Sequence, residues 1–241
     1  MTPSRRVGKP LVFLAALAPA IWLAWTLLVE WRGADWPGAG WLGADPVEKL
    51  QGETGRWTLI FLALTLAVTP LRRLFGWNGL QPYRRMLGLF AFLYATLHLL
   101  NYVALWMTFD LGDITEDVAE HPWVWIGVIA WTLLVPLAIT STKGWVRRLG
   151  GKRWQRLHRV VYVVAIAGLV HFFLAVKRDV QEPTIYALVF ATLLGARLVL
   201  RRRAAGRARL RERGDGIAPH RAGTIRDRMH PMASDASDPS S

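Results

Sequence analysis

Six long apolar segments limit what this chain can fold into. They cover residues 11–29, 57–71, 86–106, 123–140, 157–176 and 184–200. A helix needs about 20 apolar residues to cross the ~30 Å hydrocarbon core of a bilayer, because each residue adds about 1.5 Å. Most segments reach this length, although the second and the last are short. The sequence therefore predicts an all-α integral membrane protein, a six-transmembrane-helix bundle with a disordered C-terminal tail.

Basic residues alternate between successive loops. The formal net charge is +13, with 30 Lys and Arg against 17 Asp and Glu. Most basic residues precede the first segment, follow the sixth, or lie between the second and third and between the fourth and fifth. The remaining loops hold most of the acidic residues. This pattern follows the positive-inside rule, so both termini are predicted to be cytoplasmic. Because topology and contact with membrane lipid account for the charge, we expect no nucleic-acid binding.

The composition changes near residue 200. Residues 1–200 are predicted to form one membrane domain, and 201–241 a basic and then disordered cytoplasmic tail. Within the tail, 201–213 are expected to form a helix along an anionic leaflet, and 214–241 to be disordered. The N-terminus resembles a secretory signal, but its apolar run extends to Val29, which favours an uncleaved first helix.

Two histidines lie deep inside apolar segments. An imidazole in hydrocarbon is costly unless it has a partner, so His98 and His171 indicate a functional site. His98 lies ~18 Å beyond Met86 and His171 ~21 Å beyond Leu157, if each residue adds about 1.5 Å. Because both helices run in the same direction, the rings are predicted to lie at nearly one depth, in the outward half.

This arrangement suits a haem b with one axial imidazole from each side. The chain has no cysteine, which excludes thiolate ligation and covalent C-x-x-C-H attachment. Small residues one turn before the rings, such as Ala95 and Gly168, were expected to leave room for a flat macrocycle, with Tyr94 and Ala167 beside them. The alternative is a pair of core histidines bonded to carbonyl groups or to Asn101 and Tyr102.

A third histidine, His158, precedes His171 by thirteen residues, near the cytoplasmic face. On an ideal helix this spacing turns through roughly 1300°, so the two rings share one stripe only if the helix bends or the rotamers differ. His158 is a candidate ligand of a second haem, but Arg85 stands thirteen residues before His98 and cannot ligate iron. Arg84 and Arg85 are predicted to pair with haem propionates or with a phosphate. A structural role for His158 stays open.

The sequence also predicts three local features. Glu53 and Thr54 were expected near the N-cap of the second span. The loop after the fourth span was expected to hold a short amphipathic helix, with Trp145 and Leu149 at the bilayer. His121, in an outer loop, was expected to be exposed.

The pattern W-x-x-L-H-R-x-x-Y, together with His98 and His171, resembles the ferric-reductase-like transmembrane family. The pattern comprises Trp154, Leu157, His158, Arg159 and Tyr162. Within that family the chain is most similar to the haem-binding membrane subunits of bacterial periplasmic methionine sulfoxide reductases, over residues 7–200. Larger members carry two histidines on each of two helices. This chain has only one on its third span, so the number of haems is left open.

The resemblance implies a bacterial inner-membrane electron carrier that binds haem b and FMN. It implies electrons from the quinol pool or a cytoplasmic flavin reductase, and a heterodimer with a periplasmic molybdopterin reductase subunit that repairs oxidised proteins. Bond-breaking chemistry is then expected in that separate catalytic subunit. Without a G-x-G-x-x-G motif, direct NAD(P)H oxidation is not expected.

Three other functions are compatible with the sequence. The first is a ferric or other metal reductase that serves a small external acceptor. The second is a quinol-linked cytochrome b anchor for another periplasmic oxidoreductase. The third is a transporter or membrane scaffold with structural histidines, which would be colourless when purified.

Overall fold

The structure, a computed structural model, describes residues 3–33, 38, 40–176 and 180–215. Within them the regular structure is helical, and six helices are long and apolar enough to cross a membrane. This confirms the predicted all-α fold of a multi-pass membrane protein. The chain divides into two units, Met1–Leu198 and Val199–Ser241. In the second unit the chain is helical to Asp215, which includes the predicted helix at 201–213. Of the predicted disordered segment 214–241, the first two residues belong to this helix, and 216–241 lie outside the described residues.

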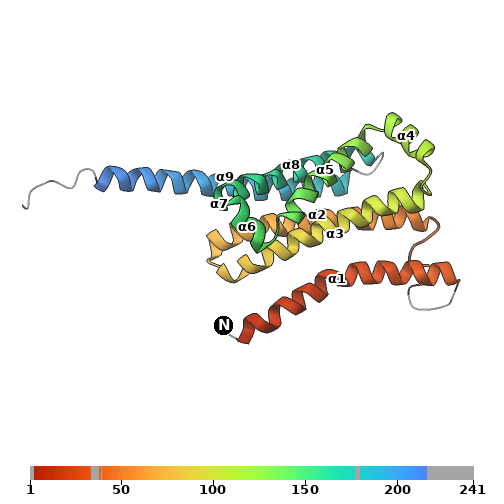
Figure 1. Cartoon of the computed structure of the whole chain (residues 1–241), viewed down its shortest axis with the longest axis horizontal. Coiled ribbons are helices and arrows are strands. Elements are labelled where there is room, and N and C mark those ends of the chain that lie inside the picture. Colours follow the sequence, from red (N-terminus) through yellow and green to blue (C-terminus); the bar gives the residue numbers. More distant parts are fainter. Residues whose placement is uncertain (1–2, 34–37, 39, 177–179, 216–241) are drawn as a thin grey trace, which may run out of the picture. The chain divides into compact units, whose positions relative to one another are not determined.

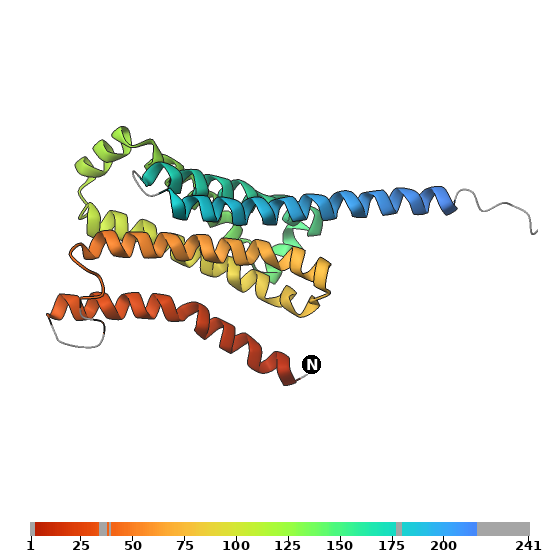
Figure 2. The same cartoon turned by 180° about the vertical axis from the view of Figure 1, so that it is seen from behind.

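The membrane-spanning elements are joined by short helices at both ends of the bundle. The long helices are α1 (Pro3–Arg32), α2 (Pro46–Phe75), α3 (Arg84–Asn101), α5 (Pro122–Ile139), α8 (Val161–Ala175) and α9 (Gln181–Asp215). The short elements are η1 (Asn78–Tyr83), the π-helical η2 (Tyr102–Trp106), α4 (Leu111–Glu120), α6 (Lys143–Leu149), α7 (Gly151–Leu157) and η3 (His158–Val160). Helix α2 packs along α3, and α5 packs along α8 (Figures 1 and 2).

The core lies where α2, α3, α5 and α8 meet. Phe61 stacks on Tyr94 with ring centroids 5.2 Å apart, and on Phe90 at 5.5 Å. Leu66, Ala91 and Tyr94 have no exposed surface. Large apolar side chains are instead exposed on the outside of every spanning helix. In water this would be unfavourable, but on a lipid-facing surface it is expected.

Helix α2 begins earlier than predicted. Its N-cap is Asp45, whose side chain accepts a hydrogen bond of 2.9 Å from the backbone N–H of Glu48, and Pro46 follows in the first turn. The prediction that the helix starts near Glu53 and Thr54 is wrong. The polar run from Glu48 to Glu53 forms the first two turns of the helix, because Asp-Pro supplies both a capping carboxylate and a preset φ. The second span is therefore a long helix rather than a short one.

Proline breaks the backbone hydrogen bonding of α1, and Tyr94 from α3 fills the gap. The Tyr94 hydroxyl donates to the carbonyl of Ala16 at 2.9 Å and accepts from the N–H of Ala20 at 3.0 Å. A regular helix would join these two backbone groups directly. Pro19 lies inside this turn, and α1 bends along its length (Figure 1). A side chain inserted into the hydrogen-bond ladder is a known cause of such bends.

A second proline leaves a carbonyl for a buried arginine. Pro70 does not end α2 but lacks an N–H, so the carbonyl of Leu66 has no donor within the helix. Arg197 of α9 donates to that carbonyl from Nε at 2.9 Å and also from Nη2. Its Nη1 donates to the hydroxyl of Tyr162 at 2.7 Å. Arg197 is only 5% exposed, so these bonds join α9 to α2 and α8 inside the bundle.

Candidate functional site

His98 is held by α2, which lies beside its own helix α3. Its Nδ1 is 3.0 Å from the carbonyl oxygen of Gln51 and 3.3 Å from the hydroxyl of Thr54. Its Nε2 is 3.2 Å from Nε2 of Gln51, whose Oε1 accepts from Asn101 at 2.6 Å. The Asn101 bond turns the Gln51 amide N–H₂ toward the histidine. Nδ1 is then the donor to the carbonyl, and Nε2 keeps its lone pair as an acceptor.

His171 repeats this arrangement on the other side of the site. Its Nδ1 is 2.7 Å from the carbonyl oxygen of Trp123, in the first turn of α5. Within the described residues its Nε2 makes no hydrogen bond. A metal-bound histidine commonly donates its second ring N–H to a carbonyl, which fixes the tautomer and the ring orientation. Both rings are therefore held through Nδ1, which leaves the Nε2 lone pair as the position that could bind a metal.

The two rings lie next to each other. Their centroids are 6.0 Å apart and their planes are inclined by 89°. One metal ion with bonds of about 2 Å to each of two opposed imidazoles needs centroids about 6 Å apart. Among the described residues, no group of three or more His, Cys, Asp or Glu side chains could hold a metal ion directly. The pair therefore fits a metal that brings its own equatorial ligands, as haem does.

A glycine of a neighbouring helix lies against each ring. A Cβ on Gly55 would lie 3.1 Å from Cε1 of His98, and a Cβ on Gly127 would lie 3.0 Å from Cε1 of His171. The small residues that make room for the rings thus come from α2 and α5. Gly168 faces Leu59 and Tyr94 is tied to α1. The room that small residues before each histidine would leave for a macrocycle stays a prediction.

The Gly55 contact yields a paired test of the site. Gly55→Ala forces the His98 ring to move, so haem binding is expected to weaken by about 10-fold or more, the range seen for groups that orient metal ligands. Gly52→Ala, on the same helix, is the matched control, because a Cβ at this position would have no atom within 4 Å. Haem per purified chain measures the difference. Equal haem content in the two variants would contradict the role given to Gly55.

His158 lies in the 3₁₀ turn η3, which interrupts the helix between it and His171. Its ring stacks on Trp154 at 3.9 Å, and its Nδ1 is 3.2 Å from the carbonyl oxygen of Trp154. Trp154 in turn donates from Nε1 to the carbonyl of Thr140 at 2.9 Å. Among the described residues, Nε2 of His158 is buried and has no partner within hydrogen-bond distance, although the backbone of Leu137 is close enough to interact with the ring. A buried imidazole nitrogen without a partner is unusual and points to a group that binds there.

The two predicted arginines differ in their surroundings. Arg84 is half-buried and close enough to His158 and Tyr162 to interact electrostatically with both. Arg85 is exposed. No described interaction joins either arginine, or His158, to the pair formed by His98 and His171. The roles of Arg84 and Arg85 in cofactor binding stay predictions.

Helix α4 connects α3, which carries His98, to α5, whose first turn holds His171 of α8. Tyr102, just after α3, donates to Asp117 of α4 at 2.7 Å. Asp117 also pairs with Nδ1 of His121 at 2.9 Å, and the His121 ring lies 4.4 Å from that of Trp123. His121 was predicted to be exposed, but it is half-buried and supports the segment whose carbonyl holds His171.

Comparison with known proteins places this chain in a family. A family model described as ferric reductase like transmembrane component matches residues 54–169. A Rhodospirillum rubrum protein named protein-methionine-sulfoxide reductase heme-binding subunit MsrQ is 48% identical over 205 residues, 84% of this chain and 94% of that protein. Proteins of the same name from Azospira oryzae and Herminiimonas arsenicoxydans are 48% and 46% identical, over 80% and 81% of this chain and 83% and 86% of their own. The chain belongs to the MsrQ family. The matched segment of this MsrQ-family protein contains His98 and His158 and ends two residues before His171.

Several residues of the MsrQ-type site were not found from the sequence. Gln51, Gly55 and Gly127 lie against the two rings, yet none was predicted as a site residue. Asn101 was considered as a direct partner of the histidines, but it bonds to Gln51 instead. The available signal was the presence of polar and glycine residues at the outer ends of the spans, at the depth of the histidines. That signal is weak, because such residues are also common in helix ends and loops.

Proposed function

We propose that this MsrQ-family protein is the haem-carrying electron-transfer subunit of a protein-methionine-sulfoxide reductase. His98 and His171 would be the axial ligands of one haem b. The observation that carries the proposal is the shared bonding of the two rings, each with Nδ1 at a carbonyl, at a centroid separation of 6.0 Å. Nε2 of His98 contacts only the side chain of Gln51, which a ligand would displace. The alternative of structural histidines explains the carbonyl bonds but not the pairing of two such rings. The relatives are named heme-binding subunits.

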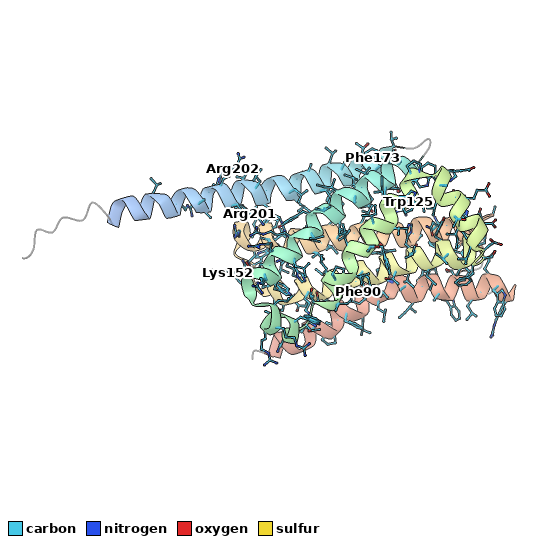
Figure 3. All side chains as sticks on the ribbon, turned by 45° about the horizontal axis from the view of Figure 1, so that its top comes forward. Phe90, Trp125, Lys152, Phe173, Arg201 and Arg202 are labelled. Carbon is cyan, nitrogen blue, oxygen red and sulfur yellow. The ribbon has the colours of Figure 1, made fainter. Side chains whose placement is uncertain are left out.

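The charge of the two ends supports an orientation in the bacterial inner membrane. Figure 3 shows Lys152 at one end of the bundle and Trp125 and Phe173 toward the other. The end with Lys152 carries the basic helices α6 and α7, and the opposite end carries α4 with Asp113, Asp117 and other acids. By the positive-inside rule the basic end and both termini face the cytoplasm. The two central histidines then lie in the periplasmic half.

A bound haem would supply reversible one-electron chemistry, and the chain would supply its setting. The carbonyl groups of Gln51 and Trp123 would hold the imidazoles as neutral ligands. Gly55 and Gly127 leave the space that the two rings occupy. The acidic helix α4 lies at the end where electrons would leave. We propose that a soluble periplasmic molybdopterin subunit, MsrP-like, binds there as a heterodimer and reduces methionine sulfoxide in oxidised proteins.

The basic end is the proposed entry for electrons from the quinol pool or a cytoplasmic flavin reductase. Nε2 of His158, which has no hydrogen-bond partner among the described residues, and the nearby Arg84 suit a second bound group. Two groups fit this chemistry: a second haem ligated by His158, or FMN with its phosphate paired to Arg84 and Arg85. Haem and FMN per purified chain distinguish them.

The function is tested by electron delivery to the partner. Reduced protein in lipid nanodiscs, freed of reductant, is mixed with the MsrP-like subunit of the same organism and a methionine-sulfoxide peptide. We expect the haem to be reoxidised only when both are present, with two electrons consumed per methionine formed. Rapid reoxidation by a ferric chelate, with none by the partner, would instead support the metal reductase function.

A further inference from the structure

The carboxylate of Asp117 on α4 joins the end of α3 to the start of α5 (Figure 1). Its Oδ2 accepts a hydrogen bond of 2.7 Å from the Tyr102 hydroxyl, and its Oδ1 lies 2.9 Å from Nδ1 of His121. The side chains of Asp117 and His121 are 24% and 31% exposed, so this group lies at the edge of the bundle. A carboxylate can accept both bonds, whereas an amide of the same size has only one acceptor oxygen.

On the α5 side, this connection leads to His171. The His121 ring packs against that of Trp123, with centroids 4.4 Å apart. The carbonyl of Trp123 accepts the bond of 2.7 Å from Nδ1 of His171. Because that bond fixes the rotation of the imidazole ring, a displacement of the first turn of α5 would turn the His171 ring.

On the α3 side, the connection leads to His98. Tyr102 directly follows Asn101, whose amide donates to the side chain of Gln51 at 2.6 Å. Gln51 in turn contacts His98 through its backbone carbonyl and through its side chain. The single carboxylate on α4 therefore joins the two sets of residues that hold the two rings.

The segment between Tyr102 and Asp117 has an unfavourable backbone. The chain leaves α3 through the π-helical η2 and then turns at Thr108 and Phe109, whose φ angles are 48° and 61°. A residue other than glycine is uncommon in this left-handed region, and a β-branched one is an outlier. Such a turn persists only where the surrounding contacts fix it. The hydrogen bond between Tyr102 and Asp117 closes the segment that contains the turn, and so helps to hold it.

We propose that Asp117 is a positioning residue whose carboxylate sets the relative orientation of the His98 and His171 rings. The planes of these rings are inclined by 89°. In a haem with two axial imidazoles, the angle between their planes influences the EPR spectrum of the low-spin ferric form. The inference rests on the proposed function, since a haem makes this orientation matter. A merely structural link between α3 and α5 would instead lower stability and leave the EPR spectrum unchanged.

The test removes one acceptor from the link. Asp117→Asn keeps the size of the side chain but leaves one acceptor oxygen for two donors. We expect the ferric EPR g-values to shift, and haem to pass to apomyoglobin about tenfold faster, the lower end of the range for groups that orient metal ligands. The signal to follow is the one that His171→Ala removes. Glu116→Gln is the matched control, because it removes the same charge from an exposed neighbour on the same helix.

Tyr102→Phe is a second variant, which removes one hydroxyl and keeps the ring. It breaks the bond to Asp117 from the other side, so the g-values should shift here as well. The inference is overturned if Asp117→Asn and Tyr102→Phe both keep the wild-type g-values and rate of haem transfer, even if they unfold at a lower temperature. It is also overturned if Glu116→Gln shifts the g-values as much as Asp117→Asn, since charge alone would then explain the effect.

A measurement without haem separates this inference from the proposed function. The chain has no cysteine, so spin labels can be attached through Leu105→Cys in η2 and Trp125→Cys in α5, both of which are exposed. In haem-free protein, Asp117→Asn should broaden the distribution of distances between the labels, and Glu116→Gln should not. If wild-type protein shows no haem band with dithionite, the proposed function fails, and the label distances still decide the role of Asp117. An unchanged distribution in Asp117→Asn would overturn that role.

Discussion

Replacement of His171 by alanine should abolish the b-type haem spectrum of the purified protein. His171 would supply one of two protein bonds to the iron, and within the described residues no other histidine lies beside His98. Low-spin haem needs both axial ligands, so the reduced α-band is expected to disappear and haem per chain to fall by more than about 100-fold, beyond the range for residues that merely orient a ligand. Optical spectra and total haem analysis measure both quantities.

His98→Ala should give the same result, since the two rings are bonded alike. His220→Ala is the matched control, because it removes a histidine from the tail and not from a membrane span. Each variant must elute as a single species in size-exclusion chromatography, so that only folded proteins are compared. A folded His171→Ala protein with an unchanged haem spectrum would remove this residue from the site.

The second large effect concerns stability. Arg197→Met keeps an unbranched apolar chain of similar length but removes the guanidinium group. The carbonyl of Leu66 and the hydroxyl of Tyr162 then lose their charged donor. Hydrogen bonds to charged groups contribute about 1.5–3 kcal/mol each, so the free energy of unfolding should fall by about 3 kcal/mol or more. Denaturant unfolding in detergent measures it, with the exposed Arg202→Met as control.

Pro70→Ala tests whether Arg197 stabilises the protein by compensating for the proline. It restores a backbone N–H that can bond to the carbonyl of Leu66, so Arg197 then has less to satisfy. Arg197→Met should therefore cost less in the Pro70→Ala background, with a coupling free energy of about 1 kcal/mol or more. If the two substitutions are additive, Arg197 does not compensate for the proline.

The spans and the relation of the two histidines could be predicted, because each follows from local periodicity and helix rise. Six apolar segments became six spanning helices, and equal depth for His98 and His171 agrees with rings that lie together. The start of α2 was missed, because the polar residues after Asp45 resemble a loop when the capping function of Asp-Pro is overlooked.

Contacts between helices far apart in the sequence could not be predicted from periodicity and helix rise. Arg197 lies inside the last apolar segment and was given no role by the sequence, yet its partners lie on α2 and α8. Tyr94 was grouped with small residues near His98, yet its hydroxyl completes the broken turn of α1. In each case a proline far away in the sequence creates the need, and only packing shows which side chain meets it. The orientation of the His158 ring could not be predicted either, because His158 lies in the 3₁₀ turn η3 and not in a regular α-helix.

The most direct test of the account is the optical spectrum of the wild-type protein, purified in detergent and recorded oxidised and then reduced with dithionite, with haem counted per chain. The account predicts a coloured protein with the spectrum of bis-histidine haem b and at least one haem per chain. A folded, colourless protein, expressed with haem in excess, would contradict it and leave His98 and His171 as structural residues.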